Sequence, residues 1–198
     1  MEISEVMAYS IEVRASEVMA QLRDTSLSTP IENEGHIVPG AYFSWDDRVK
    51  ELDLQVTSKD GQLFELRAQI SGKPQWNSFN VALEHGSTSV GDLIGVVADV
   101  SGADGLTFPL FIRTSRGESI TDTPLTEKLV GSAKRSIQTV LHKVSHVDAV
   151  AGEEGYHTLV VALPSSSFDV TLHDLRLFVL PDGEGEIAKV PTLSSYAG

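Results

Sequence analysis

The sequence contains no cysteine, few aromatic residues and an excess of acidic over basic side chains. The lack of cysteine excludes disulfides, thiolate catalysis and zinc sites of the cysteine type. With 15 Lys and Arg against 28 Asp and Glu, the formal net charge is −13, so no binding to nucleic acid is expected. The longest apolar runs, such as residues 159–163, fall far short of the roughly 18 residues of a spanning helix, so no membrane insertion is expected.

Residues 1–24 lack the basic region and the continuous apolar stretch of a secretory signal. Two interpretations of this stay open. The protein is made in the cytoplasm and acts outside the cell or on a particle surface after release by other means, or the chain is a fragment of a longer protein.

Alternation of apolar and polar residues predicts eight strands after residue 48. Turn residues separate most of them and leave no room for the helices of a parallel sheet, so we expect an all-β antiparallel β-sandwich. Asp60-Gly61 favours a hairpin between the first two. The expected strands are 49–57, 63–70, 77–84, 93–100, 106–114, 134–144, 157–163 and 168–180.

The last of these strands changes phase in its middle. Its apolar residues occupy even positions from Phe168 to Leu172 and odd positions from Leu175 to Val179. Because side chains alternate between the two faces of a strand, an uninterrupted register would turn the second set away from the core. The slip predicts a β-bulge at residues 173–174.

Three segments follow from these patterns. Residues 1–40 are expected to be an N-terminal arm, helical or irregular in its first part and a linker or long loop in its second, which is rich in Ser, Thr, Pro and Gly. Residues 41–182 are expected to form the sandwich. Residues 183–198 have little amphipathic order and are expected to be a C-terminal tail.

The order of these strands resembles the galactose-binding-like jelly-roll superfamily, which includes many carbohydrate-binding modules. Residues 91–117 look like the paired central strands of that family, with a Gly-Asp turn at the start and an arginine-containing hairpin at the end. Residues 156–180 are similar to its closing strands, with a Pro turn between them and an acidic residue before the final strand, and residues 134–144 take the place of the strand between the two. The resemblance implies a jelly-roll sandwich and a non-catalytic binding role.

Glycan sites need an exposed aromatic platform with polar side chains around it. Trp76 between Gln75 and Asn77 is the best candidate platform, with Arg113 and Arg116 as partners if the strands are ordered as in the family. The alternative is that Trp76 packs as half-buried core at the sandwich edge. A second aromatic cluster at residues 42–45 is expected to pin the linker onto the sandwich.

The resemblance also implies a structural calcium near the acidic residue before the last strand, which is Asp174 here. Asp47 is a candidate partner, because calcium takes carboxylate and carbonyl oxygens. The alternative is that Asp174 occupies a solvent-facing bulge. The His142 and His146 pair would suit a metal on a helix, but these residues are expected to leave a strand for a loop.

Catalytic motifs are absent from the sequence: it has no GxSxG elbow, no Walker P-loop and no GxGxxG. The resemblance implies a non-catalytic carbohydrate-binding module that recognises a cell-surface or polymeric glycan, and we expect it to be used as a homo-oligomer or in a larger assembly. The alternative is a structural subunit, such as a spike, fibre or decoration protein of a phage-like or cell-surface particle. A glycoside hydrolase with paired carboxylates is a third interpretation.

Overall fold

The computed structural model describes residues 10–48, 51–59 and 62–182, and it confirms the predicted antiparallel β-sandwich. All pairings between the strands of this part are antiparallel. The expected hairpin residues Asp60-Gly61 lie outside the described residues. The elements are α1 (Ile11–Asp24), β1 (Ser28–Pro30), β2 (His36–Val38), β3 (Ala41–Trp45), β4 (Glu51–Thr57), β5 (Phe64–Ser71), β6 (Asn77–Gly86), β7 (Leu93–Arg116), β8 (Ser119–Lys143), β9 (Gly155–Ala162) and β10 (Phe168–Leu180).

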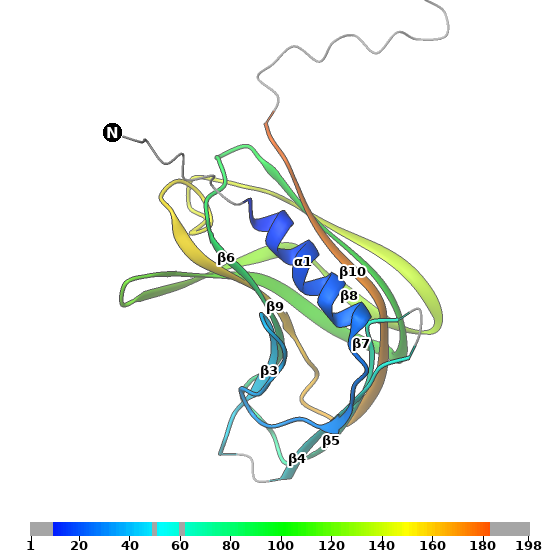
Figure 1. Cartoon of the computed structure of the whole chain (residues 1–198). Coiled ribbons are helices and arrows are strands. Elements are labelled where there is room, and N and C mark those ends of the chain that lie inside the picture. Colours follow the sequence, from blue (N-terminus) through cyan, green and yellow to red (C-terminus); the bar gives the residue numbers. More distant parts are fainter. Residues whose placement is uncertain (1–9, 49–50, 60–61, 183–198) are drawn as a thin grey trace, which may run out of the picture.

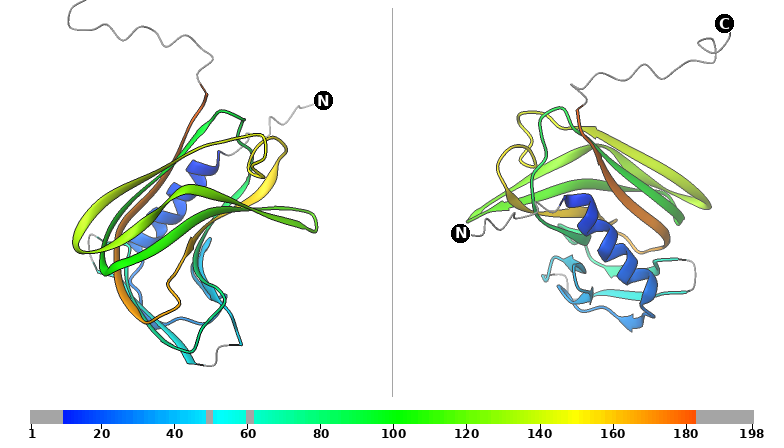
Figure 2. Two further views of the ribbon diagram at one scale, coloured as in Figure 1. Left: turned by 180° about the vertical axis from the view of Figure 1, so that it is seen from behind. Right: turned by 45° about the horizontal axis from the view of Figure 1, so that its top comes forward.

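The two layers share one long strand, β7 (Figure 1). Its first half pairs with β10, and its second half, from Leu110 to Ser115, pairs with β9. One hydrogen-bonded path, β1-β4-β5-β10-β7-β9-β6-β3-β2, therefore curls into two facing layers. Figure 2 shows β7 and β8, in green and yellow-green, as a long paired ribbon along these layers. The sequence prediction divided this stretch into separate strands at 93–100 and 106–114, and the structure corrects it to one bent strand.

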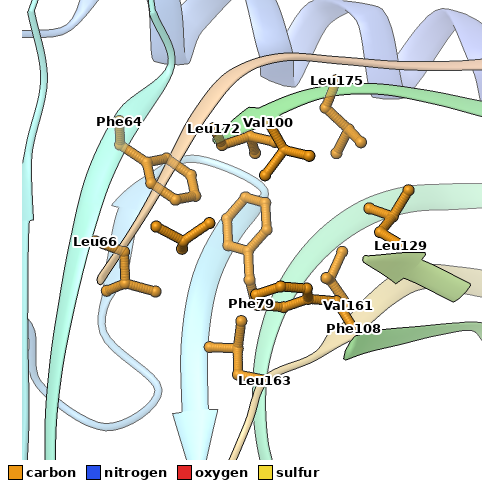
Figure 3. Close-up of a pocket in the computed structure, with 11 residues that line it drawn as sticks. Phe64, Leu66, Phe79, Val100, Phe108, Leu129, Val161, Leu163, Leu172 and Leu175 are labelled. Atoms are coloured by element: carbon orange, nitrogen blue, oxygen red, sulfur yellow. The ribbon is translucent and has the colours of Figure 1, made fainter. Parts of the chain in front are cut away.

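An aromatic cluster joins the layers in the core. Phe43 of β3 and Phe79 of β6 come from one layer, with ring centroids 5.1 Å apart, and Phe64 of β5 comes from the other, 5.1 Å from Phe79. Figure 3 shows Phe64 and Phe79 beside each other among apolar neighbours. Phe64 and Phe79 line a cavity of about 40 Å³, well below the roughly 300 Å³ of a small-molecule pocket, so the cavity belongs to the core packing.

The helix α1 closes the gap between the layers. It packs against β6 and β10, and Figure 1 shows it lying between them. One stripe of it is buried, as expected for an amphipathic helix: Ile11, Ala15, Val18, Met19 and Leu22. Among the described residues, no helix is both long and apolar enough to cross a membrane.

The second part of the predicted arm takes part in the sheet. The segment expected to be a linker or long loop contains β1, which pairs with β4, and β2, which pairs with β3. The expectation of irregular chain is therefore wrong at residues 28–30 and 36–38. The division at residue 40 stays a prediction, and the expected tail, 183–198, lies outside the described residues.

The predicted bulge in β10 is confirmed. The register of β10 against β7 shifts between Leu172 and Asp174, and the buried positions resume at Leu175 and Leu177. The shift returns the apolar side chains to the core side of the strand. Asp174, at the shift itself, is half-buried.

Removing the ring that joins the layers should destabilise the whole fold. We expect Phe64→Ala to lower the free energy of unfolding by about 3–5 kcal/mol, because a buried Phe loses both its burial and its neighbours' contacts. The measurement is urea denaturation followed by circular dichroism. The control is Val147→Ala, whose side chain is exposed and should change stability by less than about 0.5 kcal/mol. Equal effects of the two substitutions would contradict the role given to the aromatic cluster.

Candidate functional site

A groove of about 540 Å³ lies on the face of the β7-β9-β6-β3 layer that points away from the core. Side chains alternate along a strand, so Phe43 and Phe79 enter the core and their neighbours face the groove. Its lining side chains come from four strands and three connections: Glu34, Tyr42, Ser44, Gln75, Trp76, Asn77, Ser78, Asn80, Phe111, Arg113, Thr158, Val160, Ala162 and Leu163.

Trp76 lies at one end of this groove, in the connection between β5 and β6. Its side chain is 47% exposed. Asp46, at the end of β3, fixes the connection by two hydrogen bonds: its own N–H donates to the Trp76 carbonyl at 3.1 Å, and its Oδ2 accepts the Gln75 N–H at 3.1 Å. The turn that carries the indole is thus tied to the end of a neighbouring strand.

Asp46 is itself held as a carboxylate. Arg48 donates to it through Nε at 2.7 Å and Nη2 at 3.0 Å. The Arg48 hydrogen bond, followed by the bond from the Gln75 N–H, lowers the pKa of Asp46 to about 2. Asp46 is a positioning residue that sequence reasoning missed, because its contact with Gln75 joins residues far apart in the sequence.

The floor of the groove is polar and internally bonded. Asn80 donates through Nδ2 to the hydroxyl oxygens of Ser44 and Ser78, each at 3.1 Å. The two serine hydroxyls are 3.1 Å from each other. A hydroxyl has one donor and two acceptor positions, so these serines keep capacity to bond a ligand.

Arg113 forms the wall of the groove on β7. Its guanidinium lies over the Phe111 ring, 5.5 Å from the centroid. Asp122 of β8 accepts two hydrogen bonds from it, at 2.8 Å from Nε and 2.9 Å from Nη2. This bidentate pair raises the pKa of Arg113 and fixes the plane of the guanidinium.

The structure brings together Trp76, Gln75, Asn77 and Arg113, and it places Arg116 elsewhere. Arg116 lies three positions after Arg113 on the same strand, so its side chain leaves from the opposite face. Its Nε and Nη2 donate to the Glu153 carbonyl at 3.2 and 2.5 Å, and it fixes the loop before β9. The expected grouping of the two arginines is therefore wrong.

Asn77 differs from its neighbours in the groove. It is 3% exposed, and neither polar atom of its side chain has a hydrogen-bond partner within the described part of the chain. It shares with Phe79 the face of β6 that points to the core, and it borders the groove where β6 begins. A buried amide without partners is costly, and this one stays a predicted ligand contact.

The aromatic cluster at residues 42–45 has a different role from the one expected. These residues form β3, whose alternation sends Phe43 and Trp45 into the core and Tyr42 to the groove. Burial raises the pKa of Tyr42, so its phenol stays protonated and can donate a hydrogen bond. Tyr42 is a groove residue that the sequence analysis missed, because it expected residues 42–45 to lie in a loop that pins the linker onto the sandwich.

The predicted calcium position is occupied by ion pairs. Arg23 of α1 donates to Asp174, and Arg176 donates to it from Nε at 2.8 Å. Burial alone would raise the pKa of Asp174, but these two hydrogen bonds outweigh it and the pKa is lowered. Asp47 is exposed, and the described part of the chain holds no group of three or more acidic or histidine ligands that could hold a metal. Calcium stays a prediction.

Comparison with known proteins finds similarity in structure alone. No family model matches the sequence, and no curated protein does. The solved structures to which the chain is similar include the family 11 carbohydrate-binding module of a Clostridium thermocellum cellulosomal cellulase, with 6% identity over 79% of this chain and 97% of that one and a TM-score of 0.48. The family 30 module of another cellulosomal cellulase of that organism matches with 16% identity over 77% and 97% and a TM-score of 0.47. A cyclase from Fischerella matches with 12% identity over 79% and 88% and a TM-score of 0.46. At such low similarity, the function of this chain has to be judged from its own groove.

Protonation of Asp46 should change the NMR resonance of the Gln75 backbone N–H, which donates to the Asp46 carboxylate. We expect the Gln75 amide resonance to titrate with a midpoint at about 2, below the ordinary carboxylate value of 3.8. Because the folded-state pKa is the lower one, the carboxylate stabilises the fold above the ordinary value, and this contribution is lost as the pH falls through about 2. The measurement is a two-dimensional NMR titration.

Arg48→Met should move that midpoint up toward the ordinary value, because it removes the main cause of the shift. The matched control is Arg67→Met, which removes another exposed ion pair, with Asp169, and should leave the midpoint in place. A Gln75 amide that follows the ordinary carboxylate curve in the unmodified protein would contradict the link between Asp46 and the Trp76 turn.

Proposed function

We propose that the protein is a non-catalytic carbohydrate-binding module whose ligand lies in the groove beside Trp76. The observation that carries this proposal is an exposed indole at the end of a groove with a polar floor. A sugar ring has an apolar face and a rim of hydroxyls, so it needs both kinds of surface at once. The groove volume of about 540 Å³ is within the usual range of about 300–1,000 Å³ for ligand sites.

Each part of the groove has a role in this function. Trp76 stacks against the apolar face of a sugar ring, and its anchored turn limits the conformational entropy lost on binding. The Ser44 and Ser78 hydroxyls, with the Tyr42 phenol, exchange hydrogen bonds with the hydroxyl rim. Gln75 and Arg113 supply further polar contacts from the two sides.

The charged groups of the groove favour binding over hydrolysis. Glycoside hydrolysis uses a pair of carboxyl groups across the scissile bond. Among the described residues that line the groove, Glu34 is the one with a carboxylate, and Asp122 nearby is engaged with Arg113. This supports a binding role and gives no support to the enzymatic interpretation.

The structural or assembly role stays an alternative with one observation in its favour. Among the described strands, β8 pairs with β7 alone, so no described strand covers its other edge, and it exposes the apolar side chains of Ile137 and Leu141. Light scattering after size exclusion tests it. A mass several times the 21.4 kDa of one chain would support assembly, and the mass of a single chain would count against it.

Trp76→Ala should abolish or strongly weaken glycan binding. We expect a loss of about tenfold or more in affinity, since each 1.4 kcal/mol of lost interaction is tenfold. The measurement is a glycan-array screen of the purified chain, with and without calcium, followed by calorimetry on the best oligosaccharide. Tyr156→Ala is the matched control, because Tyr156 is also an exposed aromatic on this sheet but does not line the groove. Equal affinities for Trp76→Ala and the unmodified protein would contradict the placement of the site.

A further inference from the structure

Glu34 occupies a backbone conformation that is unusual for a residue with a side chain. It lies in the turn between β1 and β2 with φ of 61°, in the left-handed region that favours glycine. A non-glycine residue persists there only where its surroundings fix it. Gly35 follows directly, so the left-handed position falls on the glutamate although a glycine is adjacent.

The turn is fixed to β3 at three points. The Glu34 N–H donates to the Phe43 carbonyl at 2.9 Å. The Asn33 side chain donates to the Trp45 carbonyl at 3.0 Å and accepts from the Trp45 N–H at 2.9 Å. All three hydrogen bonds are with the strand that carries Tyr42 and Ser44, so the turn holds Glu34 at the wall of the groove.

The charge of the groove is not balanced. The Arg113 guanidinium is neutralised by Asp122, with which it shares two hydrogen bonds. Glu34 forms no ion pair with any residue in the described ranges 10–48, 51–59 and 62–182. The groove therefore keeps one uncompensated negative charge, within a chain whose formal net charge is −13.

We propose that this groove selects its glycan by charge: it prefers oligosaccharides that carry protonated amino groups, such as oligomers of glucosamine, and disfavours those that carry uronic acids. The proposal rests on the function proposed above and adds the class of sugar. Glu34 supplies the attraction, while the Asp122 pair prevents Arg113 from attracting an anionic ligand.

Calorimetry with four hexasaccharides tests the proposal on the full chain. They are the hexamers of glucosamine, N-acetylglucosamine, glucose linked as in cellulose, and galacturonic acid, in mildly acidic buffer where the amino groups are protonated. We expect glucosamine to bind about threefold to tenfold more tightly than its N-acetyl form at low salt, as for one exposed charge pair. Galacturonate should bind most weakly. The preference should shrink at about 0.5 M salt, which screens exposed charges.

Two variants separate Glu34 from the general negative charge of the chain. Glu34→Gln should bring the ratio of glucosamine to N-acetylglucosamine affinity close to one. Glu32→Gln removes the same charge two residues away, from an exposed side chain that does not line the groove, and should keep the ratio. If both substitutions lower the ratio equally, the attraction belongs to the whole surface and the proposal is overturned.

A third variant tests the part given to Arg113. Asp122→Asn should free the Arg113 guanidinium and raise the affinity for the galacturonic acid hexamer severalfold. An unchanged affinity would overturn the account of charge balance. Neutral hexamers that bind in the groove with the same affinity as glucosamine would overturn the charge preference and leave the binding function standing. Failure of all four hexamers to bind the folded protein would count against the proposed function itself.

Discussion

Because β7 leaves one layer and enters the other while it stays paired with β8, the two layers and the wall of the groove share one strand. At the bend, Gly102 has φ of 93°, and a Cβ there would lie 2.6 Å from the Asp169 carbonyl oxygen of β10. Any larger residue would push the two strands apart. In the second half of β7, Phe111 and Arg113 reach the groove while Ile112 enters the core.

The platform and the floor of the groove are held by different parts of the fold, which makes the groove rigid from both ends. The Trp76 turn depends on the carboxylate of Asp46, which in turn depends on Arg48. The floor depends on Asn80, whose amide orients two hydroxyls. Groups that are fixed before the ligand arrives lose little conformational entropy on binding, and weak contacts such as stacking and neutral hydrogen bonds are then sufficient to select a ligand.

Local patterns predicted the strands well and the site only in part. The β-bulge in β10 could be predicted because the change in the alternation of apolar and polar residues is visible in consecutive positions of the sequence. The strands β1 and β2 were missed because three residues are too few to show alternation. The residues between Ser101 and Gly105 have the composition of a turn, and that hid the continuity of β7. Side chains three positions apart on one strand point to opposite faces, so the separation of Arg113 from Arg116 is predictable once the strand is extended to residue 116. The role of Asp46 in positioning the Trp76 turn could not be predicted, because the sequence contains no local sign of its contact with Gln75.

The sign of the charge in the groove follows from the ion pairs that the arginines of this acidic chain form. Arginines that pair with an aspartate or glutamate are Arg14, Arg23, Arg48, Arg67, Arg113, Arg135 and Arg176. Exposed pairs of this kind add little stability each, but they fix orientation: Arg23 ties α1 to the bulge of β10, and Arg48 fixes the acid that anchors Trp76. Guanidinium groups that are engaged in this way are not free to meet an anionic ligand. Glu34 has no ion pair among the described residues. In the function proposed here it is therefore the charge that a ligand meets, and the pairing that orders the surface would also decide which ligand charge the groove accepts.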